Sequence, residues 1–373
     1  MNIAYYMPFK PMGHPNPSGD LVTGTELFHY LRGRGHTIEP VSRLRCRWLY
    51  LKPWGLVQLA AETVRTINRC RGLKPDIWLS YHSYYKAPDM LGPACSRRLA
   101  IPYVLFQGIY STKRRRSVKT LPGFLLNRRS LLAARTVFTN KRADERNLLR
   151  LLPAHRVCYV PPGIHPEAYC FDPESRQTLR ESWKTGNRPV VFTAAMFRPG
   201  VKADGLREVI HSCAAIIAGG TKLQLVIAGD GAEREMLERE AKKDLPGAIL
   251  FLGKIPRSEM HRYYSGADLF AFPGVQESLG MVYLEAQSCG LPVVAFKDWG
   301  ASEAVVHERT GLLAHIAERH TFAENIERLV LDRELRRGMG KEAADHVRRV
   351  HDLDKNYGIV EQKLGELIRP SRS

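Results

Sequence analysis

Short apolar runs recur along the chain, and segments with helical spacing separate them. Residues 2–9 (NIAYYMPF) predict a first strand, and the Gly/Pro-rich residues 11–24 predict a loop. Residues 25–35 place Leu27, Leu31 and neighbouring aromatic side chains on one helical face, and residues 36–41 predict a second strand. This order of strand, glycine-rich turn, helix and strand is typical of a βαβ unit.

The same alternation continues through both halves of the chain and predicts two parallel α/β domains. The further strands that we expect are 75–82, 101–108 and 135–140 in the first half, and 188–196, 222–231, 248–255, 267–274 and 291–296 in the second. We expect an N-terminal domain over 1–165, a linker over 166–188 and a C-terminal domain over 189–354. The last segment, 355–373, is expected to cross back to the first domain.

Composition is that of an ordinary globular protein, with 44% apolar and 25% charged residues in a chain of 373. No apolar run reaches the length that a spanning helix needs, and the N-terminus lacks a basic region followed by a long apolar stretch. We therefore expect a cytoplasmic location. The seven cysteines are widely spaced and form no C-x-x-C pair, so they are interpreted as reduced thiols that neither bind metal nor form disulfides.

The net charge of +18 is concentrated in the first half of the chain. Residues 1–165 contain 27 basic and 8 acidic residues, whereas residues 166–373 contain 29 and 30. An anionic partner is indicated, and a nucleic acid, a membrane surface and a phosphorylated substrate all remain open. Residues 43–56 and 111–132 mix Lys and Arg with Trp, Phe and Leu, which favours an anionic membrane surface. A simply solvated surface is the alternative, and no recognition module for nucleic acid accompanies the charge.

Residues 277–296, ESLGMVYLEAQSCGLPVVAF, hold two acids with seven residues between them, ahead of a buried strand. Glu277 follows the strand 267–274, and ligands of open α/β sheets bind at the carboxyl ends of strands. Glu285 falls about one and a half turns into the helix that follows. The N–H groups of Leu279, Gly280 and Met281 stand at the start of that helix, where anions are favoured. Since acids repel phosphate, we expect these two to accept hydrogen bonds from hydroxyl groups, although a dipole-facing Glu277 and a solvated Glu285 remain an alternative.

Two other patterns carry less weight. The stretch GDGAER (229–234) resembles a dinucleotide fingerprint but lacks the third glycine, and D352-x-D354 lies in a polar C-terminal stretch rather than after a strand. No P-loop, HExxH or G-x-S-x-G motif is present in the sequence. NAD binding is therefore weakly supported, and D352-x-D354 is interpreted as a chance match rather than a metal site.

Several ordered motifs resemble glycosyltransferase family four, the group one set with the GT-B fold. They are LVIAGDG (225–231), ILFLGKI (249–255), YYSGADLFAFP (263–273), ESLGMVYLEAQSCGLPVVA (277–295) and the pair GASEAV and TGLL within 300–313. YVPPGI (159–164) resembles the hinge of that family, and residues 24–36 resemble its first loop and helix. The resemblance implies an α/β fold of two doubly wound Rossmann-like domains facing across a cleft that holds the active site.

The resemblance also implies residue roles. Glu277 would contact the transferred sugar, and Glu285 would hold the ribose of the nucleotide. The amides of Leu279, Gly280 and Met281 would meet sugar and phosphate, Lys254 and Ile255 would lie along the base, and Gly19 or Gly24 would admit the diphosphate. Arg198 and Lys202 would neutralise the leaving diphosphate without a metal.

Two positions depart from the pattern of the family. Met196 and Phe197 occupy the place where the family has Arg-Leu, so Arg198 comes two residues late. Gln107 stands where a sugar-contacting histidine is usual, and His82, after the preceding strand, is a candidate substitute as well as an ordinary structural histidine.

The resemblance thus implies a metal-independent, retaining hexosyltransferase that uses a nucleotide diphosphate sugar as its donor and needs no bound cofactor. Its acceptor is expected to be a glycan or lipid-linked molecule in cell-surface polysaccharide or glycolipid synthesis, reached at the inner face of the membrane through the basic N-terminal half. A non-catalytic sugar-nucleotide or glycan binder is the alternative, and a nucleic-acid-binding protein, suggested by charge alone, is the weaker one. No nucleic acid is expected as a partner.

Overall fold

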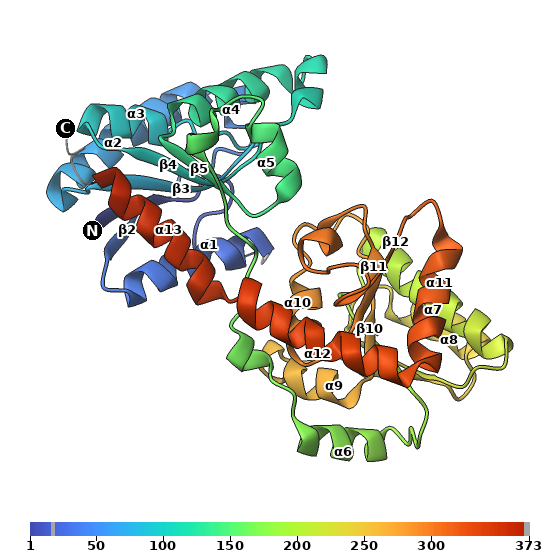
Figure 1. Ribbon diagram of the computed structural model, residues 1–373. Helices are drawn as coiled ribbons and strands as arrows, with labels where there is room; N and C mark the ends of the chain where they lie inside the picture. The colour runs from blue at the N-terminus through green and yellow to red at the C-terminus, as the bar shows by residue number, and fades with distance from the viewer. Residues whose placement is uncertain (16–18, 369–373) are drawn as a thin grey trace. The chain divides into compact units, whose positions relative to one another are not determined.

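The computed structural model describes residues 1–15 and 19–368, which divide into two compact units. The N-terminal unit comprises Met1–Val160 together with the residues from Asp354 onward, and the C-terminal unit comprises Pro161–Leu353. Each unit has its own six-stranded sheet in which every pair of neighbouring strands is parallel (Figure 1). The expected α/β class with two doubly wound sheets is confirmed.

The sheet of the N-terminal unit has the strand order β2-β1-β3-β4-β5-β6. Its strands are β1 (Asn2–Tyr6), β2 (Thr37–Ser42), β3 (Ile77–Ser83), β4 (Tyr103–Gly108), β5 (Thr136–Thr139) and β6 (Val157–Tyr159). Its helices are α1 (Gly19–Gly33), α2 (Gly55–Leu73), α3 (Gly92–Leu99), α4 (Leu121–Ala133), α5 (Arg142–Leu148) and α13 (Leu353–Ile368), with single 3-10 turns η1 (Leu49–Leu51), η2 (Thr112–Arg116) and η3 (Ala154–Arg156).

Side chains that alternate along the central strands bury two different helical layers. Tyr6 and Trp78 point into the core beneath α2, α3 and α4, where Cys70 of α2 and Cys95 of α3 join them. On the other face, Phe106 meets Tyr357 of α13 edge-on. The sheet is therefore covered on both sides, as a parallel sheet requires (Figure 1).

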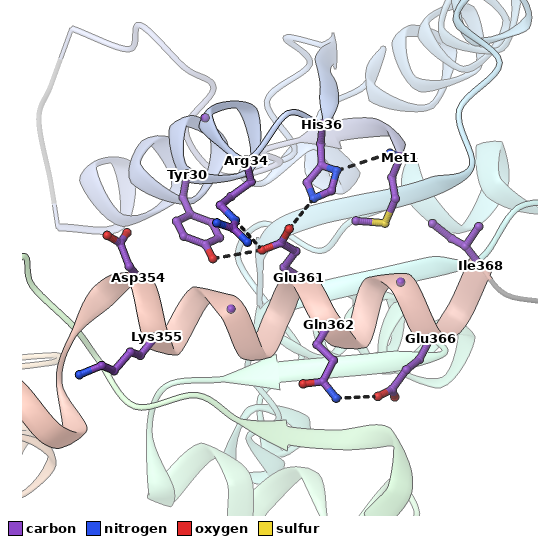
Figure 2. Close-up of a pocket in the computed structure, with 13 residues that line it drawn as sticks. Met1, Tyr30, Arg34, His36, Asp354, Lys355, Glu361, Gln362, Glu366 and Ile368 are labelled. Atoms are coloured by element: carbon purple, nitrogen blue, oxygen red, sulfur yellow. Dashed lines mark hydrogen bonds and ion pairs between the residues drawn. The ribbon is translucent and has the colours of Figure 1, made fainter.

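Helix α13 is fastened to the N-terminal unit by one carboxylate. Glu361 accepts hydrogen bonds from Tyr30 Oη at 3.1 Å and Arg34 Nε at 3.1 Å, and its other oxygen lies 3.0 Å from His36 Nε2 (Figure 2). Burial alone would raise the pKa of Glu361, but hydrogen bonds from His36, Arg34 and Tyr30 hold it below its ordinary value. Together with the packing of Tyr357 against Tyr30, these bonds attach the end of the chain to its beginning.

The sheet of the C-terminal unit has the order β12-β11-β10-β7-β8-β9. Its strands are β7 (Val190–Ala194), β8 (Gln224–Ala228), β9 (Ile249–Gly253), β10 (Leu269–Ala271), β11 (Val293–Phe296) and β12 (Gly311–Ala314). Its helices are α6 (Pro173–Ser182), α7 (Val201–Ala218), α8 (Arg234–Asp244), α9 (Met260–Gly266), α10 (Met281–Ser288), α11 (Arg319–Leu331) and α12 (Arg333–Val350), with 3-10 turns η4 (Pro166–Tyr169), η5 (Arg257–Glu259) and η6 (Gly300–Glu303).

The strands expected from the apolar runs are all present, but the segment expected as a linker is not one. Residues 166–188 contain η4 and α6 and belong to the C-terminal unit. Asp172 caps α6 by accepting from the N–H groups of Glu174 and Ser175. Arg176 and Arg180 of α6 then pair with Asp268 at 2.7 and 2.8 Å, which ties this polar helix to the sheet.

The first loop is also shorter than expected, because α1 already begins at Gly19. Residues 16–18 of that loop lie outside the described part of the chain. Gly24 is buried inside α1, and a Cβ there would meet Met7 Cε at 2.6 Å and the Tyr81 ring at 2.7 Å. Gly24 therefore lies in a packed helix and not in the loop in which it was expected to admit the diphosphate.

Candidate active site

Two predicted site residues meet at the carboxyl edge of the sheet in the C-terminal unit. Lys202, in the first turn of α7 after β7, contacts Glu277, in the loop between β10 and α10, through Nζ and Oε1. The same ammonium lies 5.2 Å from the centre of the Phe272 ring. Two loops that follow separate strands therefore place one cation and one carboxylate side by side, at the edge where ligands of open α/β sheets bind.

Two opposing effects act on the pKa of the Lys202 ammonium. Burial and the charge of nearby Arg198 lower its pKa to about 8, while the touching carboxylate of Glu277 acts in the opposite direction.

Helix α10 begins beside this pair with unused backbone donors. Within the described chain, no acceptor pairs with the N–H groups of Leu279, Gly280 or Met281. Gly280 has φ of +67°, and a Cβ there would meet the Tyr283 ring and the Gly300 carbonyl oxygen. A left-handed, close-packed glycine thus turns the chain so that the first amides of α10 stay open, an arrangement suited to a phosphate or hydroxyl oxygen.

Glycines allow the loop after β8 to pack closely against the loop after β7. A Cβ at Gly229 would clash with the Ala195 carbonyl oxygen. Gly229 has a φ of 142° and Gly231 a φ of 152°, which side chains rarely permit. Phe197 is fully buried and packs edge-on against Phe251, whereas Arg198 is exposed. The departure from the family pattern therefore has a structural reason: Phe197 fills the core, and Arg198 is the first side chain of the loop able to carry charge to a ligand.

Glu285 lies in a more enclosed setting than Glu277. Its Oε1 accepts from Tyr169 at 3.1 Å and from Arg257 Nε at 3.2 Å, and its Oε2 accepts from Tyr264 at 3.3 Å. Burial raises the pKa of this carboxyl, and the Arg257 charge and the tyrosine hydroxyls oppose that shift. No hydrogen bond or ion pair of the described chain joins Glu285 to Glu277 or Lys202, so the two acids of the motif have different surroundings.

The remaining residues that were predicted to contact the donor are exposed or half-buried. Lys254 is exposed and Ile255 half-buried, just after Gly253, whose φ is +75°. The Gly253 carbonyl accepts from the Gly229 N–H at 2.8 Å, which joins this turn to the loop after β8. Gly19, the first residue of α1 in the other unit, is exposed, and a Cβ there would meet open space.

In the N-terminal unit, the ends of β3 and β4 carry two residues with unusual backbone. His82 and Gln107 have φ of +66° and +58°. The register pairs Tyr81 with Phe106 and Ser83 with Gly108, so His82 and Gln107 lie opposite one another at the carboxyl edge. Positive φ at two non-glycine residues costs energy and is common at functional sites.

The side chains of these two residues have different partners. Gln107 Oε1 accepts from Tyr81 Oη at 2.7 Å, so this buried amide is engaged inside the unit. His82 Nδ1 lies 3.1 Å from Asp20 Oδ1, and the imidazole packs among Phe9 and Tyr84. Burial would raise the pKa of Asp20, but His82, Lys141 and Lys10 hold it below its ordinary value.

Sequence reasoning missed the partners that hold the predicted residues. Asp20 next to His82, and Tyr169, Tyr264 and Arg257 around Glu285, come from distant segments and match no local motif. Tyr169 in particular lies in the stretch interpreted as a linker.

Comparison with known proteins finds a family that part of the chain resembles. Residues 175–346 match the family model described as glycosyl transferases group 1. A GDP-mannose-dependent alpha-(1-6)-phosphatidylinositol monomannoside mannosyltransferase of Mycobacterium tuberculosis is 31% identical over 225 residues, which cover 58% of this chain and 57% of that protein. The D-inositol 3-phosphate glycosyltransferase of Corynebacterium jeikeium is 36% identical over 201 residues, 50% and 46% of the two chains. The match to these curated relatives thus spans about half of their length.

Solved structures show the fold. HepE of Anabaena in complex with UDP superposes with a TM-score of 0.76 at 19% identity, over 98% of this chain and all of that one. Sucrose-phosphate synthase of Thermosynechococcus elongatus gives 0.72 at 18% identity, over 98% and 99%. The chain has the GT-B fold of these glycosyltransferases. Within its C-terminal unit, residues 175–346 are similar to the group 1 glycosyl transferases.

Proposed function

We propose that the protein is a retaining hexosyltransferase that moves a sugar from a nucleotide diphosphate sugar to a glycan or lipid-linked acceptor. The observation that carries the proposal is the contact between Lys202 and Glu277 beside the open amides of α10. A cation and amide donors suit a diphosphate, and a neighbouring carboxylate suits sugar hydroxyls. GDP-mannose is the first donor to test, because the relative from Mycobacterium tuberculosis described above and other curated relatives are named as GDP-mannose-dependent.

The chemistry assigned to this site is stabilisation of the leaving group. As the bond between sugar and diphosphate breaks, negative charge grows on the phosphate oxygens. Lys202, Arg198 and the amides of Leu279, Gly280 and Met281 would hold that charge without a metal. Glu277 would orient the sugar ring through its hydroxyl groups, and a front-face route assisted by the leaving diphosphate would keep the anomeric configuration without a nucleophilic side chain.

Glu285 would hold the ribose through its remaining acceptor capacity. Its three protein donors fix the carboxylate in place, and each carboxylate oxygen has two lone-pair sites, so Oε2 keeps room for one hydroxyl. Lys254 and Ile255 would flank the base, and Gly19 would let the backbone approach the diphosphate.

An anionic acceptor is supported by a basic pocket in the N-terminal unit. Tyr110 and Thr112 follow β4, and together with Arg115, Arg116 and Arg150 they line a pocket of about 320 Å³ without an acidic residue. Such a lining suits a phosphate-bearing acceptor. His82, supported by Asp20, and Gln107 would contact the acceptor or the donor sugar at the same carboxyl edge of the sheet.

We further propose that the enzyme works on the cytoplasmic side of a membrane, in glycolipid or cell-surface polysaccharide synthesis. No helix of the described chain has the length and apolar character to cross a bilayer. The excess of basic residues in the first half supports attraction to anionic lipids, and several relatives act on phosphatidylinositol mannosides.

A turnover assay tests the proposal. The purified protein is incubated with GDP-mannose, UDP-glucose and other nucleotide sugars, with extracted membrane lipids as acceptors, after a thermal-shift screen that ranks the donors. Sugar transfer with retained configuration is the expected result. Saturable donor binding without transfer to any acceptor would instead identify the non-catalytic binder, which the glutamine at position 107 permits.

A further inference from the structure

A groove in the N-terminal unit lies away from the residues discussed so far. It has a volume of about 760 Å³ and runs between α2, α3 and α4. Leu56 and Leu59 of α2, Met90 before α3, and Leu126 of α4 give it apolar walls. This volume is typical of cavities that hold a small organic ligand.

The position of the groove separates it from the substrate edge. Tyr103, which opens β4, and Arg135, which precedes β5, line it, so it lies at the amino ends of these parallel strands. His82 and Gln107 occupy the carboxyl ends of β3 and β4. A ligand in the groove would therefore leave the substrate edge of the unit open.

Three arginines line the groove without a counter-charge. Within the described chain, the side chains of Arg97, Arg129 and Arg135 make no hydrogen bond and no ion pair. The one acid in the lining, Asp89, is fully buried and accepts from Ser80 at 2.5 Å, Tyr103 at 2.8 Å and two backbone N–H groups. Since Asp89 is engaged inside the unit, the groove combines apolar walls with uncompensated positive charge.

Large apolar side chains are exposed on the same helical layer. Trp54, just before α2, is 77% exposed, and Val57 in its first turn is 61% exposed. Leu125 of α4 is 49% exposed, one residue before the groove-lining Leu126. Exposed Trp and Leu beside basic residues are typical of surfaces that enter the interface of a bilayer.

We propose that this groove binds one anionic phospholipid, with an acyl chain along the walls formed by α2 and α4 and its phosphate between Arg97 and Arg129. The inference rests on the membrane contact in the proposed function and adds a specific lipid site to it. A nucleic acid would satisfy the arginines but has no chain to fill apolar walls, so the lipid is the ligand that both properties favour. The bound lipid would hold the enzyme on the membrane while leaving the carboxyl edge of the sheet free for the acceptor.

A soluble lipid tests the site itself. Monoacyl phosphatidylglycerol, below its micelle concentration, is titrated into the full-length protein by calorimetry, with monoacyl phosphatidylcholine for comparison. We expect saturable one-to-one binding of the anionic lipid. Ala94→Phe, which puts a ring into the groove without changing charge, should abolish it. Absent or non-saturable binding, or full binding by Ala94→Phe, would overturn the proposal.

Vesicles then test the charge. Arg97→Glu with Arg129→Glu should weaken binding to vesicles containing phosphatidylglycerol by roughly ten-fold or more. The control, Arg32→Glu with Arg337→Glu, makes the same change of charge at exposed arginines of α1 and α12 and should bind like the parent. Equal losses in both pairs, or tighter binding of RNA than of vesicles by the parent, would contradict a lipid site. The thermal shift with the best nucleotide sugar, measured in every variant, separates failure of this site from failure of the proposed transferase.

Discussion

Lys202 on α7 and Glu277 before α10 are in direct contact at the carboxyl edge of the C-terminal sheet. An arriving diphosphate would compete with the Glu277 carboxylate for the ammonium. Under the proposed function, Lys202 would turn to the phosphate, and Glu277 would then be released to accept hydrogen bonds from the sugar. The ion pair would thus be a resting arrangement in which each group compensates the other until donor arrives.

This exchange predicts different defects for the two residues. Lys202→Ala should lower kcat/KM for the donor by roughly 10²–10³-fold, because a cation aimed at the leaving group is lost. Glu277→Gln should lower kcat more than it raises KM, because the amide still fills the space but orients hydroxyl groups less well. Steady-state kinetics with the best donor provide both values. Lys222→Ala, at an exposed lysine of the same unit, is the control and should match the parent.

The lowered pKa of Lys202 predicts a pH dependence of donor binding. The diphosphate needs the protonated amine, whose pKa is about 8 in the free protein. The association constant should therefore be constant below pH 7 and fall by up to about ten-fold per pH unit above 8. Calorimetric titrations with the donor across this range check the expectation. Lys202→Arg keeps its charge throughout and should bind with a flat profile, so an identical decline in that variant would exclude Lys202 as the titrating group.

The surroundings of Glu285 predict that two variants of this residue will differ in folding stability but will share a loss of donor binding. Glu285→Ala removes the acceptor of two tyrosine hydroxyls and one ion-pair partner of Arg257, and it should destabilise the unit by about 1–3 kcal/mol in urea unfolding. Glu285→Gln keeps an acceptor oxygen and should cost less, yet both variants should lose the thermal shift given by the best donor. A full donor-induced shift in Glu285→Gln would remove the residue from the ribose site. Tyr264→Phe deletes one supporting hydrogen bond without touching the carboxylate and serves as the matched comparison.

The sequence was sufficient for most strands of the sheets because these strands are continuous apolar runs. β8 (Gln224–Ala228) and β11 (Val293–Phe296) are buried along their whole length, so their prediction did not depend on any distant residue. It failed where structure comes from distant partners. Helix α6 is polar, and two of its arginines attach it to the sheet through Asp268, almost ninety residues away in the sequence. The short strands β6 and β12 gain their stability from neighbours already in the sheet.

Some residues of the candidate site were likewise predictable from the sequence, and others were not. Glu277 and Lys202 were predictable, since each follows a strand of one parallel sheet and such loops share an edge. The placement of Gly24 in a loop was wrong, because a glycine that allows close helix packing looks the same in the sequence as one that forms a loop. Tyr169 and Asp20 carry no local signal at all, and only the folded chain brings them to Glu285 and His82.

The pair formed by Asp20 and His82 yields a final prediction with a defined sign. Because the pKa of Asp20 is below its ordinary 3.8, the pair stabilises the folded state above that pH, and this contribution is lost as the pH falls through the lower folded value. His82→Gln should therefore unfold more easily than the parent at pH 5, by about 1 kcal/mol, and the difference should shrink as the solution is acidified below pH 3.

If His82 contacts substrate, the same variant should also lower the rate of sugar transfer, while Asp20→Asn should lower it less because the imidazole remains. Denaturant unfolding at several pH values and transfer assays at neutral pH measure the two effects separately. A variant that loses stability as described but transfers sugar at the parental rate would limit His82 to a structural role. In that case the strained backbone shared by His82 and Gln107 would need a different explanation, since the cost of two positive φ angles must be compensated by the fold alone.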